Sequence, residues 1–198
     1  MKRIIFSIWQ DTDWRDYKDL LVNKQREYAE FCDADYHCIE YDSFEFSRLQ
    51  FEKLNWADHY LDFYDEVLYL DLDVIPRKNM SFFEKHDLNT FCVHYTMKPD
   101  WKIKAKNDAL GYQGKNKIAN TGVFGLNQNL KGMLTKEHNF DNNEVFVSYL
   151  IEKDEIPCTE ISGAWNFILD KNYRKYSEAH YFLHVSNKDF TSYPLERY

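Results

Sequence analysis

The sequence predicts a single compact α/β domain in which a Rossmann-like sheet is flanked by helices. In the first half of the chain, short apolar runs of strand length alternate with longer segments of helical spacing. The 198 residues suit one domain, and no internal repeat or low-complexity linker divides them. Hydrophobic residues make up 44% of the chain, with only six Gly and four Pro, which is typical of a globular protein.

The first half of the chain follows the order strand, helix, strand, helix, strand. The predicted strands cover residues 3–9, 36–41 and 66–70, and the predicted helices cover 14–31 and 49–64. The segment Asp11-Thr-Asp13 offers an N-cap for the first helix, in which Leu21 and Tyr28 lie on one apolar face. This alternation is typical of a parallel sheet with crossover helices.

The second half is less regular. Strands are predicted at 91–95, 122–126 and 181–185, and a helix at 144–153. The stretch 98–117 is rich in lysine and shows little apolar periodicity, so we expect an irregular loop. Two interpretations of this loop remain open. Its lysines, among them Lys102, Lys104 and Lys106, could lie near a diphosphate or an anionic acceptor, or they could belong to a solvated surface loop.

Composition excludes several classes of function. The formal net charge of −8 argues against nucleic-acid binding. No apolar run approaches the roughly 20 residues of a membrane span, and the N-terminal apolar run is too short for a signal peptide. The four cysteines form no Cys-x-x-Cys pair and are expected to be buried thiols in a reducing compartment. We therefore expect a cytoplasmic protein.

One Asp-x-Asp triplet stands out by its position. Three such triplets occur, at 11–13, 33–35 and 71–73, and about two are expected by chance in this composition. Only Asp71 and Asp73 follow a buried strand, at the carboxyl edge where α/β sheets bind ligands. In an extended segment both carboxylates would face one side, which suits Mg²⁺ or Mn²⁺. The alternative is that they cap a turn or a helix.

Four segments carry a resemblance to a known family. Residues 64–74 (Tyr-Asp-Glu-Val-Leu-Tyr-Leu-Asp-Leu-Asp-Val) resemble the metal-binding segment of GT-A-fold glycosyltransferases, closest to the family 8 group of glycogenin and bacterial galactosyltransferases. Segments 120–124, 165–167 and 182–185 are similar to later motifs of that family and occur in the same order. The resemblance implies one GT-A domain over 1–198 with a mixed sheet. Its nucleotide-binding half (1–75) ends in Asp-x-Asp and is followed by an acceptor-side half (76–198).

The resemblance also implies roles for individual residues. It implies Mn²⁺ or Mg²⁺ on Asp71, Asp73 and His184. The residues expected to contact a UDP-sugar donor are Ile8, Trp9, Asp11, Lys53, Asp71, Leu72, Asp73 and Lys188. The candidate catalytic residues are Glu144, Asp141 and Asn120. From spacing alone, His184 is more typical of a core histidine, and Lys53 could equally be an exposed helix lysine.

The expected function is metal-dependent transfer of a sugar, of the hexosyltransferase type, from a nucleotide-sugar to a glycan or other hydroxyl acceptor. One alternative is a phosphohydrolase of the haloacid dehalogenase type, in which the first Asp of the triplet is a nucleophile. Another is a non-catalytic sugar-nucleotide-binding domain of a larger glycan-synthesis protein or complex. A nucleotidyltransferase is disfavoured because no glycine-rich loop follows the first strand.

Overall fold

A computed structural model of the chain describes residues 1–10, 15–41, 46–77, 80–97, 100–168 and 180–185. The strands are β1 (Arg3–Gln10), β2 (Asp35–Tyr41), β3 (Glu66–Leu70), β4 (Val74–Pro76), β5 (Phe91–Thr96), β6 (Ile118–Asn127), β7 (Cys158–Glu160), β8 (Phe167–Ile168) and β9 (Phe182–His184). The helices are α1 (Arg15–Phe31), α2 (Phe46–Tyr60), α3 (Phe82–Lys85), α4 (Asp100–Leu110) and α5 (Asn143–Glu152), with 3₁₀ turns η1 (Gln128–Leu130) and η2 (Gly163–Trp165).

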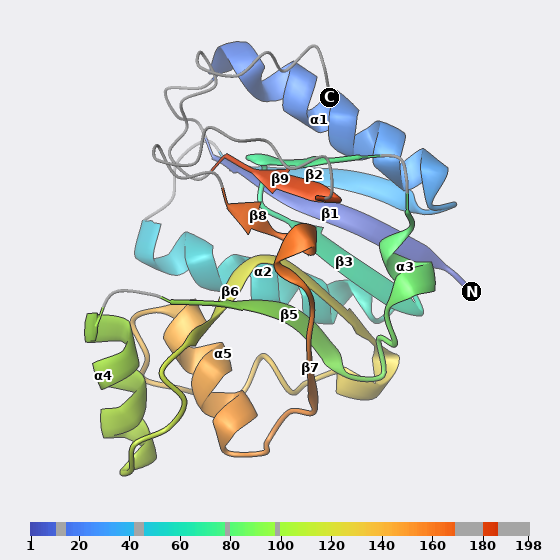
Figure 1. The fold of residues 1–198 in the computed structure, drawn as a ribbon. Helices are drawn as coiled ribbons and strands as arrows, with labels where there is room; N and C mark the ends of the chain where they lie inside the picture. The colour runs from blue at the N-terminus through green and yellow to red at the C-terminus, as the bar shows by residue number, and fades with distance from the viewer. Residues whose placement is uncertain (11–14, 42–45, 78–79, 98–99, 169–179, 186–198) are drawn as a thin grey trace.

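Two sheets organise these elements (Figure 1). The central sheet has the strand order β2-β1-β3-β6-β5-β7, and a smaller sheet has the order β4-β9-β8. β1 is parallel to β2 and β3, as expected for strands joined by crossover helices. β6 is antiparallel to both β3 and β5. The predicted mixed α/β fold is therefore confirmed.

Helices cover both faces of the central sheet. One face packs against α2 and α5, and its core includes Phe6, Tyr60 and Phe146. The other face packs against α1, α3 and the small sheet, and its core includes Ile5 and Trp165. Neighbouring residues of β1 enter opposite cores because side chains alternate along a strand. In this arrangement, the carboxyl end of β3 lies next to the small sheet (Figure 1).

The predicted elements agree with the structure within a few residues, with one exception. The stretch 98–117 is not an irregular loop, because α4 occupies residues 100–110. The buried residues of this helix are Lys106 and Leu110. A lysine on the inward face hides the apolar periodicity by which an amphipathic helix is recognised in a sequence.

Lys106 is an internal residue of the fold and does not face a ligand from the surface. Its side chain is 0% exposed, its ammonium forms an ion pair with Glu152 of α5, and it donates to the carbonyl of Lys115 at 2.5 Å. The same glutamate accepts from the Lys115 amide at 2.9 Å. Lys106 therefore joins α4 to α5, and both interpretations offered for it from the sequence are wrong: it neither faces a ligand nor lies in a solvated surface loop.

Replacing Lys106 by methionine should destabilise the protein by about 3–5 kcal/mol, because the carboxylate of Glu152 would stay buried without its cation. Urea denaturation would measure this loss. The double variant Lys106→Met with Glu152→Gln should recover much of it, since no unpaired charge remains. Lys104→Met is the control: Lys104 pairs with Asp108 on the exposed side of α4 and should contribute at most about 0.5 kcal/mol. Equal losses for the two single variants would contradict a structural role of Lys106.

The four cysteines are free thiols. Cys32 and Cys92 are buried as predicted, whereas Cys38 and Cys158 are half-buried. Burial raises the pKa of the Cys92 thiol to about 11. Among the described helices, none combines the length and the apolar character needed to cross a membrane.

Candidate metal centre

The segment Asp71–Val74 forms a tight turn at the carboxyl end of β3. The Asp71 amide donates to the carbonyl of Gly122 in β6 at 2.7 Å, and the Asp71 carbonyl accepts from the Val74 amide at 2.9 Å. Gln25 of α1 donates to the carbonyls of Asp71 and Val74, both at 2.9 Å, so it holds the two ends of the turn. The expectation of an extended Asp-x-Asp segment is therefore wrong, and the turn sets the direction of the two carboxylates.

The turn brings both carboxylates to a histidine from the small sheet. Asp71, Asp73 and His184 each offer a ligand atom, and these atoms lie within 4.8 Å of one another. β9 pairs antiparallel with β4, and Val74 lies opposite His184 in that register. The Asp73 Oδ1 atom lies 3.4 Å from His184 Nε2. Two carboxylates and an imidazole within this span are a donor set that suits Mn²⁺ or Mg²⁺.

Asp71 is held in its ionised form by two neighbours. Its Oδ1 atom accepts from the Tyr69 hydroxyl at 2.6 Å and from the Lys53 ammonium at 3.0 Å. Burial by itself would raise the pKa of Asp71, but the charges of Lys53 and His184 and the Tyr69 hydrogen bond together lower it. Burial in turn raises the pKa of Tyr69, so its hydroxyl stays protonated as a donor.

Lys53 is not an exposed helix lysine. Its side chain is only 10% exposed, and besides Asp71 it donates to the carbonyl of Thr121 in β6 at 3.0 Å. Its ammonium also lies 4.9 Å from the centre of the Tyr69 ring. Lys53 therefore acts on the Asp71 carboxylate directly and ties α2 to the strand ends that carry the site.

His184 is buried, yet it faces charge. Burial lowers the pKa of its ring, but the carboxylates of Asp73 and then Asp71 outweigh this effect and raise it. On the other side of the ring, Nδ1 lies 2.8 Å from Asn166 Oδ1. Asn166 donates its amide to Asn120 Oδ1 at 2.9 Å. The predicted residue Asn120 thus contacts His184 through Asn166.

The other two candidate catalytic residues lie in different surroundings. Glu144, in the first turn of α5, is buried, and its carboxylate pairs with Lys102 of α4 at 2.5 Å. Asp141 is exposed, and its backbone carbonyl accepts from the Gln50 side chain at 2.8 Å. Lys102 is therefore a partner of a candidate catalytic carboxylate, in contrast to Lys106.

The remaining predicted donor-contacting residues are distributed as follows. Ile8 packs in the core beneath α2, and Trp9 and Leu72 belong to one buried cluster with Leu183 of β9. Their side chains therefore belong to the hydrophobic core. Asp11 and Lys188 lie outside the described residues.

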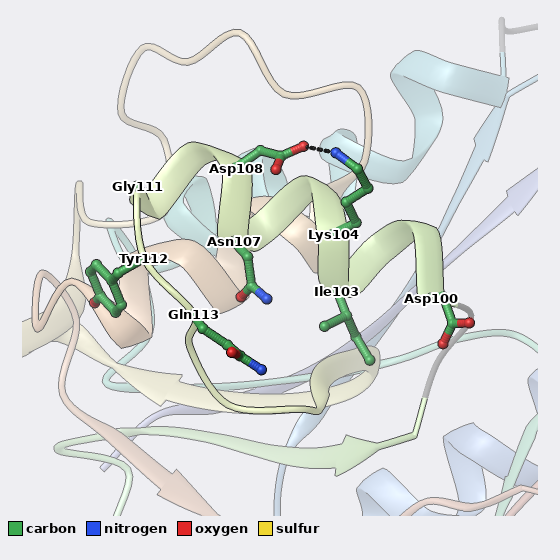
Figure 2. A pocket seen from close by; sticks show the side chains of 8 residues that line it. All are labelled: Asp100, Ile103, Lys104, Asn107, Asp108, Gly111, Tyr112 and Gln113. Atoms are coloured by element: carbon green, nitrogen blue, oxygen red, sulfur yellow. Dashed lines mark hydrogen bonds and ion pairs between the residues drawn. The ribbon is translucent and has the colours of Figure 1, made fainter.

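A pocket runs along α4, and its lining residues differ from those of the carboxylate cluster (Figure 2). It is lined by Asp100, Ile103, Lys104, Asn107, Asp108, Gly111, Tyr112 and Gln113. In Figure 2, Lys104 and Asp108 form their ion pair on one side of the helix, and Ile103, Asn107 and Gln113 lie on the other. No predicted site residue of the Asp71 cluster contributes to this pocket.

Four residues of the centre had no role assigned from the sequence. Tyr69 lies two positions before Asp71, so strand alternation could have placed both on one face. Gln25 is a polar residue on the apolar face of its helix, which also signals a buried contact. Asn166 belongs to a resembling segment without a stated role. Gly122 belongs to the resembling segment 120–124, also without a stated role, and a Cβ there would lie 2.6 Å from His184 Cε1.

The fold has counterparts among solved structures. No protein-family model matches the sequence, and no curated protein is significantly similar to it. A glycosyltransferase involved in glycosylation of the major capsid of PBCV-1 is similar at 16% identity and a TM-score of 0.68, covering 97% of this chain and 96% of that one. The galactosyltransferase LgtC follows at 15% and 0.58, covering 98% and 93%. Mouse xyloside xylosyltransferase 1 is similar at 11% and 0.54, covering 94% and 98%. At these identities the likeness concerns the fold, and the chain accordingly has the mixed α/β architecture of GT-A glycosyltransferases.

Proposed function

We propose that this protein is a metal-dependent glycosyltransferase that moves a sugar from a UDP-sugar to a glycan or another hydroxyl acceptor. The observation that carries the proposal is the convergence of Asp71, Asp73 and His184 at the carboxyl end of β3, within 4.8 Å of one another. α/β sheets bind ligands at this edge. The glycosyltransferase fold and the ordered resemblance to the family 8 group support the same function.

The three side chains would hold Mn²⁺ or Mg²⁺. When bound, the cation supplies Lewis-acid stabilisation of the negative charge that builds on the diphosphate leaving group. Lys53 and Tyr69 keep Asp71 ionised and fix its direction. Gln25 holds the turn, so the two carboxylates are preorganised before any ligand binds.

Glu144 and Asp141 stay our candidates for receiving the proton of the acceptor hydroxyl, should the reaction require a base. The Lys102 ion pair connects Glu144 to α4, so the position of this carboxylate is held by two helices. The exposure of Asp141 leaves it accessible to a large acceptor. Asn120 acts, in this proposal, through His184.

A phosphohydrolase is less well supported. It would require Asp71 to attack phosphorus, but Lys53 and Tyr69 both donate to its Oδ1 atom and reduce its nucleophilicity. The fold neighbours described above are glycosyltransferases. A sugar-nucleotide-binding domain without activity would share the fold, and slow hydrolysis of the donor distinguishes an enzyme from it.

Nucleotide binding should depend on the metal, because the phosphates of UDP complete the coordination of an ion that the protein alone binds loosely. UDP at about 100 times its dissociation constant, with Mn²⁺, should stabilise the protein by about 2.7 kcal/mol. This is a rise in Tm of roughly 5–10 °C for a chain of this length. Differential scanning fluorimetry with UDP and either Mn²⁺ or a chelator measures it, and GDP tests the choice of base. Equal stabilisation with the chelator would remove the metal from the proposal.

A further inference from the structure

A chain of buried hydrogen bonds begins at the main-chain amide of Gly122. This N–H can only donate, and it lies 3.0 Å from Asn120 Oδ1. It therefore determines which end of the Asn120 amide is the oxygen. Asn166 approaches the same atom at 2.9 Å, so Asn166 must present its NH₂ group to it.

The orientation of Asn166 then determines where the proton of His184 lies. With its nitrogen facing Asn120, Asn166 presents its oxygen to His184 Nδ1, 2.8 Å away. An amide oxygen only accepts, so Nδ1 must carry hydrogen. A neutral imidazole has one such hydrogen, which leaves Nε2 with a free lone pair directed at the carboxylates.

The opposite tautomer would have a competing partner. Asp73 Oδ1 lies 3.4 Å from His184 Nε2 and would accept a proton placed there. Such a proton would occupy the lone pair that a metal ion needs. Asn120, Asn166 and His184 are 3%, 1% and 6% exposed, so bulk water cannot readily replace the hydrogen bonds between them. The neighbouring Trp165 is buried against Phe82, Tyr181 and Phe182. This packing holds the adjacent residue Asn166 in place.

We propose that Gly122, Asn120 and Asn166 form a relay that holds neutral His184 in the tautomer with hydrogen on Nδ1, so that Nε2 is free to bind a cation. Asn120 and Asn166 are positioning residues, because they act through the histidine. The tautomer itself is independent of the proposed function, and only its use for metal binding rests on that function.

Nitrogen-15 NMR of protein labelled at histidine tests the relay directly. Spectra are recorded with a chelator, at a pH high enough that the ring shifts no longer change, and the His184 signals are assigned with His184→Gln. The wild type should show His184 with hydrogen on Nδ1. Asn166→Leu removes the acceptor, so the hydrogen should move in large part to Nε2. The Mn²⁺ dissociation constant, measured by electron paramagnetic resonance of the free ion, should rise about 10- to 100-fold.

Two further variants separate the relay from simple packing. Asn166→Asp keeps an oxygen acceptor for Nδ1 and should keep the tautomer, whatever its effect on stability. Asn143→Leu removes another buried amide, which donates to the Gln50 carbonyl and Thr121 Oγ1, and should destabilise the protein without changing His184. A wild-type spectrum with the hydrogen on Nε2 would overturn the relay, and this test needs no variant. So would an unchanged tautomer in folded Asn166→Leu. A wild type with the expected tautomer but no Mn²⁺ binding would support the relay and contradict the metal-dependent function.

Discussion

Replacing Asp73 by asparagine should reduce sugar transfer by at least about 10²-fold while the fold stays intact. The substitution removes one of two carboxylates from the cluster, and a metal ion contributes several kcal/mol to stabilising the leaving group, where each 1.4 kcal/mol is tenfold in rate. The fold should tolerate the substitution, because asparagine has nearly the same shape as aspartate. The contact that changes, between Asp73 Oδ1 and His184 Nε2, is long, at 3.4 Å. Release of UDP from a UDP-sugar in the presence of Mn²⁺ measures the effect, and circular dichroism checks the fold.

Asp33→Asn is the matched control. It makes the same chemical change in a triplet that occurs by chance, on the exposed turn after α1. Asp33 has a φ of 51°, a left-handed conformation that asparagine also adopts readily, so no strain is added. Activity should stay near the wild-type value. Similar losses in the two variants would show that the position of Asp73 at the end of β3 does not matter.

Replacing Gly122 by alanine should abolish metal binding through a steric effect alone. The added Cβ would lie 2.6 Å from His184 Cε1, 2.9 Å from Asp71 Oδ2 and 3.0 Å from Asn120 Oδ1. Hydrogen bonds hold all three side chains, so they cannot move away without disturbing the cluster. We expect a loss of Mn²⁺-dependent UDP stabilisation and of at least about 10²-fold in transfer, with about 1–3 kcal/mol of destabilisation from overpacking.

Gly125→Ala, three residues further along β6, separates this local effect from general overpacking. Its Cβ would lie 2.5 Å from Phe82 Cε1, in the hydrophobic core on the α1 face. This variant should lose stability by a similar amount but keep its Mn²⁺-dependent response to UDP. If both glycine variants lost that response equally, close approach at Gly122 would not be the cause.

The alternating pattern of strands and helices was predictable because it depends on neighbours in sequence. The apolar run of β3 followed by Asp71 and Asp73 identified the ligand edge of the sheet from local composition. His184 was proposed only through the order of resembling segments, since its spacing alone is more typical of a core histidine. α4 was not predicted because one of its two buried residues is Lys106, whose partner Glu152 lies 46 residues away in sequence.

By itself, the sequence determined the α/β class, the position of Asp71 and Asp73 at a strand end, and the candidate set that includes His184. Only the tertiary structure decided that residues 71–74 form a turn, that Lys53 and Tyr69 converge on Asp71, and that Asn120 reaches His184 through Asn166. The contacts of Lys53 with Asp71 and of Asn166 with Asn120 and His184 join residues 18 to 46 positions apart, whereas the turn and the Tyr69 bond are local. Hydrophobic periodicity records which face of an element is buried, whereas a polar contact depends on which donor and acceptor the folded chain brings within about 3 Å.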